Sequence, residues 1–208
     1  MVYLPPAFTE KRPEVLLEHI ERYDFGLLVT HGPEGLVASH IPFRTERDGG
    51  QLHLHGHLAR PNPQVGDLAR GGEVLAIFHG PHAYISPNWY ATRPSVPTWN
   101  YVDVHAYGTV QLVEDAEWLR RFLARLSERH EARNPVAWRM QDLPGAYVET
   151  MLKGIIGLDI AVTRLEGKYK LSQNRPAADR LGVVAALEAQ SDPESHAVAR
   201  LMRDRETV

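Results

Sequence analysis

Six segments of the chain predict β-strands, either by a two-residue alternation of apolar and polar positions or by a short run of apolar and β-branched residues. The clearest one places Ile156, Leu158 and Ile160 on one face. Turn sequences separate neighbouring segments at 32–35 and 48–50, which predicts hairpins and antiparallel pairing. The predicted strands are Phe25–Thr30, Leu36–Arg44, Gln51–Leu58, Glu73–Ser86, Val102–Val113 and Ile156–Leu165.

Apolar residues spaced three or four positions apart predict helices, as Trp118, Phe122 and Leu126 illustrate. The predicted helices cover residues 9–23, 62–70, 115–133, 146–153, 176–189 and 194–203. The chain shows no strand–helix–strand rhythm, so we expect a mainly β fold with peripheral helices, of the α+β class. Six strands joined by hairpins close most economically into a barrel, because closure leaves few open edges.

The composition narrows the range of functions. The 208 residues include no cysteine, which excludes disulfides, thiol catalysis and cysteine–metal sites. No apolar run approaches about 18 residues and no signal peptide is evident, so we expect a cytoplasmic protein without a membrane partner. The net charge of -3 predicts no whole-surface attraction to nucleic acid. The sequence shows no nucleophile elbow, phosphate loop or zinc-peptidase motif, so catalytic residues stay unassigned.

A histidine-rich segment over residues 53–62 is the first candidate site. His53, His55 and His57 would point to one face of a strand, as metal ligands can. Their spacing is tight and no carboxylate lies within the strand, so we predict no metal site. At the end of the same strand, Arg60 and Asn62 could meet an anion. The alternative is an exposed arginine followed by an asparagine that caps a helix.

Two further segments could contact a ligand. Residues 80–101 gather aromatic and proline side chains, which would line a planar ligand, bury against a partner subunit or form a rigid loop. Residues 168–176 bring basic and hydrogen-bonding side chains to the end of the last strand, as a binding site or as a solvated strand end capped by Asn174. The arginines at 200, 203 and 205 are interleaved with acids and predict an exposed helix rather than a DNA-reading one.

Four longer stretches of the sequence resemble the PaiB family, known as FMN-binding negative transcriptional regulators. They are Leu54–Arg60, Gly80–Tyr90, Val96–Tyr101 and Lys170–Arg175, and the resemblance covers roughly residues 1–175. The PaiB family is similar to the split-barrel flavoproteins that include pyridoxamine-phosphate oxidase. The resemblance therefore implies a six-stranded antiparallel split β-barrel of the FMN-binding type, a homodimer and FMN at the subunit seam. Residues 1–175 would form this domain, with 176–208 as a helical extension packed on it.

The resemblance also suggests roles for individual residues. The oxidase group meets the flavin phosphate with a Ser-Arg-Lys stretch, and Ala59-Arg60-Pro61 occupies the similar place here, so the arginine is kept while the serine and lysine are absent. The phosphate would be held by Arg60 with help from Asn62, His57 or a basic residue such as Arg175. The remaining expected flavin contacts are Tyr84, Trp89 and Trp99 for the planar slot, and Asn100, Ser172, Gln173 and Asn174 for polar groups.

These observations lead to one expected function and three alternatives. The expected function is that of an FMN-binding dimeric regulator of the PaiB type, with DNA or a partner regulator as its target. The acidic net charge does not support direct DNA binding. The alternatives are a flavin-dependent oxidoreductase, a haem-handling variant that uses His55, His57 or His82, and a regulatory dimer without a cofactor.

Overall fold

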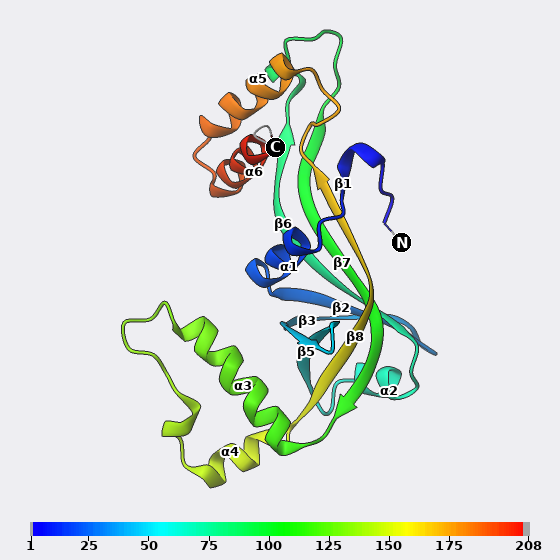
Figure 1. Ribbon diagram of the computed structural model, residues 1–208, viewed down its shortest axis with the longest axis vertical. Helices are drawn as coiled ribbons and strands as arrows, with labels where there is room; N and C mark the ends of the chain where they lie inside the picture. The colour runs from blue at the N-terminus through cyan, green and yellow to red at the C-terminus, as the bar shows by residue number, and fades with distance from the viewer. Residues whose placement is uncertain (1, 206–208) are drawn as a thin grey trace. The chain divides into compact units, whose positions relative to one another are not determined.

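The computed structural model describes residues 2–205 and is mainly antiparallel β-structure with helices around it (Figure 1). Its strands are β1 (Thr9–Glu10), β2 (Phe25–Gly32), β3 (Gly35–Pro42), β4 (Arg44–Asp48), β5 (Gln51–Ala59), β6 (Glu73–Ile85), β7 (Thr98–Val113) and β8 (Ile155–Lys170). Its α-helices are α1 (Pro13–Arg22), α2 (Gln64–Ala69), α3 (Ala116–Glu131), α4 (Gly145–Leu152), α5 (Ala177–Glu188) and α6 (Pro193–Asp204), with short 3-10 helices η1 (Pro6–Phe8), η2 (Pro87–Trp89) and η3 (Met140–Asp142). No helix in this part of the chain is long and apolar enough to cross a membrane.

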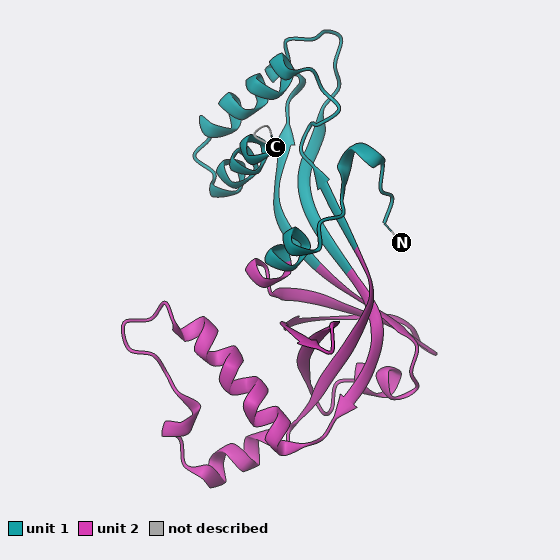
Figure 2. Ribbon diagram, viewed as in Figure 1, with its two compact units in different colours: residues 1–19, 78–105, 166–208 teal, residues 20–77, 106–165 magenta. Residues whose placement is uncertain are grey.

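Two compact units divide the chain (Figure 2). Unit 1 comprises residues 1–19, 78–105 and 166–208, and unit 2 comprises residues 20–77 and 106–165. The long strands β6, β7 and β8 contribute residues to both. Helices α5 and α6 belong to unit 1 together with segments from the first half of the chain. The sequence predicted another division, into residues 1–175 and 176–208. That division concerns the extent of the family domain rather than compactness, and it stays a prediction.

The predicted six-stranded closure is visible in the strand pairing. Strands β3 and β4 are separated only by Phe43, so they are two halves of one bent strand. The first half pairs with β2 and the second with β5, both antiparallel. Since the remaining order is β2–β6–β7–β8–β5, the bent strand completes a ring. The structure has eight strands in its described part because the bent strand counts twice and the two-residue β1 is added.

Small residues bring strands and helices of unit 2 close together. The side chain of Ile41 approaches within 3.1 Å of where a Cβ on Gly56 would lie, which places β3 against β5 across the interior. A Cβ on Gly157 would lie 2.6 Å from the Trp118 ring, so only glycine lets α3 pack this closely on β8. The interior is filled by buried apolar residues from all sides: Leu28, Phe43, Leu54, Leu58, Ala76, Leu158 and Ile160.

In unit 1, the strand segments bury one face against helices. Val102 and Val104 of β7 are fully buried, as are Val183 and Leu187 of α5 and Val198 of α6. At about 1.5–3 kcal/mol for each large apolar side chain, this burial is the main stabilisation of α5 and α6. Capping adds to it, because the Asp192 carboxylate accepts hydrogen bonds from the first N–H groups of α6.

Candidate functional site

An exposed aromatic surface lies on the strand segments of unit 1. The rings of Tyr84 in β6 and Trp99 in β7 pack edge to face with their centroids 5.9 Å apart. Tyr84 is 48% exposed and Trp99 52%, although both stand on well-paired strands. Large aromatic side chains held rigidly in solvent mark a binding surface. Sequence reasoning selected both residues, and the structure brings them together.

A chain of polar side chains leads to this aromatic surface. The ring of His79 is hydrogen-bonded through Nδ1 to the carboxylate of Asp103 and through Nε2 to Nδ1 of His82, 3.1 Å away. The His82 ring in turn lies 6.1 Å from the ring of Trp99. The backbone N–H of His82 donates to Glu194 at 3.3 Å. An aspartate, two histidines and an aromatic ring therefore follow one another, an arrangement that can hold and pass a proton.

Two lysines lie on the neighbouring strand β8. The Nζ atom of Lys170 donates to Thr98 Oγ1 and to the backbone oxygen of Trp99, which fixes the start of β7. Burial lowers the pKa of Lys170, and the charges of Lys168 and Arg175 lower it further. Lys168 lies 5.4 Å from the centre of the Tyr101 ring. Through these contacts, the two lysines stabilise the ends of the strands.

Asn100 and Ser172 face the opposite side of the strands from Trp99. Asn100 is fully buried, and its side-chain amide donates to Ser172 Oγ at 3.0 Å while Ser172 Oγ donates back at 3.2 Å. The same amide contacts the sulfur of Met202 in α6. The left-handed backbone of Ser172, with φ of 64°, turns the chain at the end of β8. The pair satisfies its own hydrogen bonds, so its predicted contact with flavin stays a prediction and a structural role is the better fit.

The structural role of Asn100 gives a direct test. Replacing Asn100 with alanine should lower the free energy of unfolding by about 1–3 kcal/mol, because Ser172 Oγ is left buried without its partner. Urea unfolding of the variant measures the loss, with exposed Asn88→Ala as the matched control. A fall in FMN affinity at unchanged stability would instead support the direct flavin contact.

The other predicted residues at the end of β8 make local contacts. Gln173 accepts a hydrogen bond from the Leu171 N–H at 2.7 Å and donates to the Tyr169 carbonyl oxygen, so its amide closes the turn. Arg175 stacks 4.3 Å above the Tyr90 ring and lies 3.8 Å from the Asp179 carboxylate. Asn174 is exposed.

The half-buried Trp89 belongs to a loop that α5 holds in place. A Cβ on Gly182 of α5 would lie 2.3 Å from the Trp89 carbonyl oxygen. The Asp179 carboxylate accepts a hydrogen bond from the Thr92 N–H at 2.9 Å. Burial raises the pKa of Asp179, but the hydrogen bonds from Thr92 and Ala91 and the charge of Arg175 outweigh it and hold the pKa below its ordinary value. Helix α5 therefore fixes the conformation of this part of the loop through contacts with Trp89 and Thr92.

Arg60 and Asn62 lie at the end of β5 in unit 2. The Arg60 side chain is 37% exposed and lies 3.6 Å from the exposed carboxylate of Glu114, a weak ion pair that an anion can replace. Asn62 Oδ1 accepts from the Gln64 N–H at 2.9 Å, and its Nδ2 donates to Ser39 Oγ at 3.1 Å. Asn62 therefore lies just before the N-cap residue Pro63 and accepts from the first N–H of α2, while Arg60 keeps its guanidinium accessible.

His57 is covered by helix α3. Its ring packs edge to face on Phe122 with centroids 5.8 Å apart, and its Nδ1 is buried without a hydrogen-bond partner. Burial lowers the pKa of His57, so the ring is neutral at physiological pH. Its predicted help to a flavin phosphate stays a prediction, and it would require α3 to uncover the ring.

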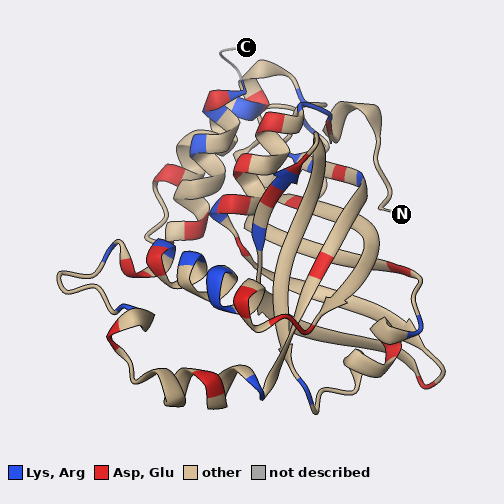
Figure 3. Cartoon of the chain, turned by 60° about the horizontal axis from the view of Figure 1, so that its bottom comes forward, with Lys and Arg blue, Asp and Glu red and all other residues tan. Residues whose placement is uncertain are grey.

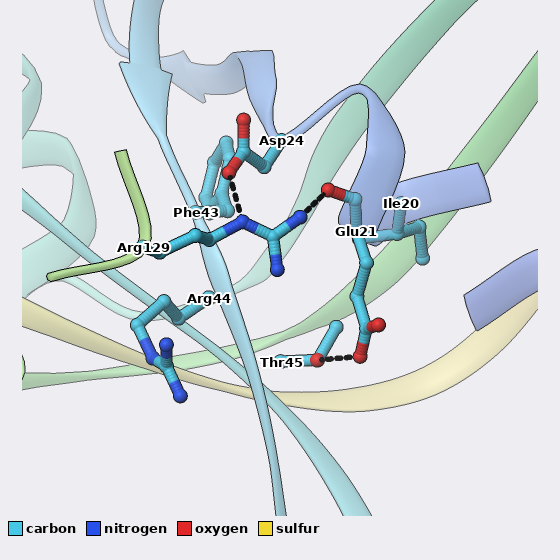
Figure 4. A pocket seen from close by; sticks show the side chains of 7 residues that line it. All are labelled: Ile20, Glu21, Asp24, Phe43, Arg44, Thr45 and Arg129. Carbon is cyan, nitrogen blue, oxygen red and sulfur yellow. Dashed lines mark hydrogen bonds and ion pairs between the residues drawn. The ribbon is translucent and has the colours of Figure 1, made fainter. Parts of the chain in front are cut away.

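A small polar cavity in unit 2 was not predicted from the sequence. Ile20, Glu21, Asp24, Phe43, Arg44, Thr45 and Arg129 line its volume of about 100 Å³ (Figure 4). Arg129 pairs with the Asp24 carboxylate at 3.0 Å and donates to the Glu21 carbonyl oxygen, while Thr45 donates to the Glu21 carboxylate at 2.8 Å. The cavity is too small for a flavin.

One cluster joins two histidines of the histidine-rich segment to an acidic residue that the sequence analysis did not connect with them. His53 and His55 in β5 meet the carboxylate of Asp159, which stands opposite His55 on β8. The sequence could not show this, because Asp159 lies 106 residues after His53.

At two points, the residues present fit FMN, the cofactor that the sequence resemblance implies. Trp99 offers an exposed apolar ring, with Tyr84 packed edge to face beside it, and an isoalloxazine ring can stack on such a ring. Arg60 offers an accessible guanidinium of the kind that a phosphate dianion needs. These two points belong to different units of the chain, and each is tested separately below.

The chain is similar to known proteins both in sequence and in fold. The family model described as "Putative FMN-binding domain" matches residues 2–164. Protease synthase and sporulation protein PAI 2 of Bacillus subtilis is 35% identical over 98% of this chain and 98% of its own length. The FAD and haem binding protein of Mycobacterium smegmatis has a TM-score of 0.58 at 16% identity, over 83% of this chain and 78% of that one. The flavocytochrome Anf3 of Azotobacter vinelandii has a TM-score of 0.55 at 12% identity, over 94% of this chain and 78% of that one.

Proposed function

Because the chain belongs to the PaiB-type family of FMN-binding domains, we propose that it is an FMN-binding dimeric regulatory protein. The family match confirms the resemblance and the cofactor predicted from four stretches of the sequence, and the structural neighbours confirm the split-barrel fold. Dimer formation and regulation are the parts that this proposal adds.

The single observation that supports the proposal is the exposed pair of Tyr84 and Trp99. Two large rings on rigid strands would be stabilised by a flat apolar partner, and a flavin ring has that shape. Independently of the aromatic surface, we propose Arg60 of unit 2 as a phosphate contact. When bound, FMN supplies the capacity to accept and donate electrons. The chain's own residues would orient the ring, and His82, which is hydrogen-bonded to His79, lies next to Trp99.

The aromatic surface also supports the dimer. A two-fold interface uses the same surface on both subunits, so exposed aromatic side chains on strands suit it. Light scattering during gel filtration should give twice the chain mass. Trp99→Ala should shift the protein toward monomer, while exposed Tyr147→Ala on α4 should not. A monomer at all concentrations would remove dimer formation from the proposal.

The proposed regulation does not use the C-terminal arginines to read DNA. Arg203 makes two hydrogen bonds of 2.7 Å to the Glu188 carboxylate, and Arg205 pairs with Glu10. Acidic and basic residues both occur along α6 (Figure 3). The Bacillus subtilis relative carries a name that refers to protease synthesis and sporulation. We therefore favour a partner regulator as the target, and salt-sensitive, sequence-specific binding of the pure protein to DNA would overturn this choice.

Flavin retention tests the cofactor proposal directly. The untagged protein should show flavin absorbance between about 300 and 600 nm after excess FMN is added and removed by desalting. Trp99→Ala should weaken FMN binding roughly three- to tenfold through loss of stacking, with Tyr147→Ala as the control. A folded protein that retains no flavin would instead be the cofactor-free regulator.

The polar chain from Asp103 through His79 to His82 favours a second function, a flavin-dependent oxidoreductase. His82 could give or take a proton beside the aromatic surface, and Asp103 would orient His79. Anaerobic mixing with NADH or NADPH tests it, since reduction bleaches the flavin band. A His82→Gln variant that retains flavin but is reduced more slowly would support this proton transfer. Flavin that neither nucleotide reduces would leave the regulatory function alone.

A further inference from the structure

The outer face of β5 carries two histidines that converge on one carboxylate oxygen. His53 Nδ1 lies 2.6 Å from Asp159 Oδ1, and His55 Nε2 lies 3.5 Å from the same atom. The three ligand atoms are all within 4.8 Å of one another. Three donor atoms this close together can hold one cation between them.

Strand register fixes this geometry. His53 and His55 are two positions apart on β5 and share a face, and Asp159 is directly opposite His55 on β8. The Trp118 ring of α3 packs over His55 with centroids 4.9 Å apart, which restricts its rotation. Trp118 can approach because position 157 is glycine. Paired strands and a covering helix therefore hold the three side chains together, as a preorganised metal site requires.

Distance and donor type select the class of ion. A tetrahedral ion with ligands at about 2.0–2.1 Å separates its ligand atoms by about 3.3 Å. The distance from His55 to Asp159 already matches this value, and His53 would need to move back by less than about 1 Å. Two imidazole nitrogens with one carboxylate suit first-row transition ions, whereas calcium and magnesium prefer oxygen ligands throughout.

Access and charge are compatible with a bound ion. The side chains of His53, His55 and Asp159 are each about a fifth exposed, so an ion can enter and water can complete its shell. Glu46, paired opposite His53 on β4, adds negative charge on the same face, and Arg44, opposite His55, adds positive charge. The guanidinium of Arg44 is directed to the Arg125 carbonyl oxygen, 3.4 Å away.

We propose that His53, His55 and Asp159 form a binding site for a divalent transition-metal ion of the zinc class, with an open position for water. The site lies within unit 2 and uses none of the residues proposed to contact flavin. It does not depend on the proposed function. A bound ion would tie β5 to β8 beneath α3 and would stabilise the folded chain.

Calorimetric titration of the full, untagged chain with Zn²⁺, after chelator treatment and desalting, tests the site. We expect one ion per chain with a dissociation constant in the micromolar range or tighter. His53→Gln, His55→Gln and Asp159→Asn should each weaken binding at least about tenfold. Exposed His40→Gln, on β3, is the matched control and should bind as the parent does.

A second measurement keeps the test independent of folding defects. Co²⁺ in place of Zn²⁺ should give a visible ligand-field band, seen as a difference spectrum in flavin-free protein, and His53→Gln should abolish the band while the circular dichroism is unchanged. The absence of saturable binding up to about 0.1 mM Zn²⁺ would overturn the proposal. Equal affinity in the three variants and the control would overturn it as well. Repeating the titration with FMN present should give the same affinity, so failure of flavin binding and failure of metal binding are distinguishable.

Discussion

Replacing Arg60 with glutamine should weaken FMN binding by between about tenfold and a hundredfold. Within residues 2–205, the charged partner of the guanidinium at the end of β5 is the exposed Glu114, so it is available to a phosphate. Loss of one charge-assisted hydrogen bond costs about 1.5–3 kcal/mol, which corresponds to that range. Fluorescence quenching of free FMN during titration with protein measures the change.

Two comparisons make the Arg60 result specific. Arg47→Gln removes the same charge from an exposed position near the β4–β5 turn and should leave affinity unchanged. Riboflavin lacks the phosphate, so its affinity should be the same for the parent and for Arg60→Gln. If the variant binds FMN as tightly as the parent, the phosphate is held elsewhere and the assignment of Arg60 is wrong.

Replacing Glu10 with glutamine should lower the free energy of unfolding at neutral pH by about 2–3 kcal/mol. The buried carboxylate accepts hydrogen bonds from the N–H groups of Lys11 and Arg12, both at 2.9 Å, and pairs with the guanidinium groups of Arg12 and Arg205. Burial alone raises the pKa of Glu10, but these hydrogen bonds and charges lower it from 4.5 to about 2. A shift of this size corresponds to about 3 kcal/mol of stability.

The same pKa shift predicts how stability depends on pH. Because the folded pKa of Glu10 lies below its unfolded value, the contribution is fully present above about pH 5 and is lost as the pH falls toward 2. Urea unfolding at several pH values should therefore show a steeper acid loss for the parent than for Glu10→Gln. Exposed Glu18→Gln on α1 should retain the steep loss. Parallel curves for the parent and Glu10→Gln would show that the carboxylate has no special role.

Much of the fold follows from local sequence patterns. All six predicted strands occur in the ring, because period-two alternation directly reflects one buried and one outer face. The alternation did not reveal that β7 begins at Thr98 and that β8 continues to Lys170. Those extensions carry aromatic and charged residues on their outer side, and hydrogen bonding to neighbouring strands rather than local propensity makes them extended.

The candidate site was harder to predict because function depends on which face a side chain occupies. Asn100 lies on the same strand face as Val102 and Val104, because all three occupy even positions, and this face is buried. Trp99 occupies an odd position and therefore lies on the outer face. The predicted flavin contacts of all three residues stay predictions, and the structure shows Tyr84 and Trp99 exposed and Asn100 buried. The carboxylate of Asp159 could not be assigned to His53 and His55 from local sequence, since only strand register relates them.

The chain passes between its two units at four points, after residues 19, 77, 105 and 165. No single cut of the polypeptide therefore separates one unit from the other, and any fragment that begins or ends inside the chain holds incomplete parts of at least one. Half-length fragments are for this reason poor reagents for assigning activities to either unit. Point substitutions in the intact chain, such as those at Arg60, Trp99 and His53, are the way to study each unit separately.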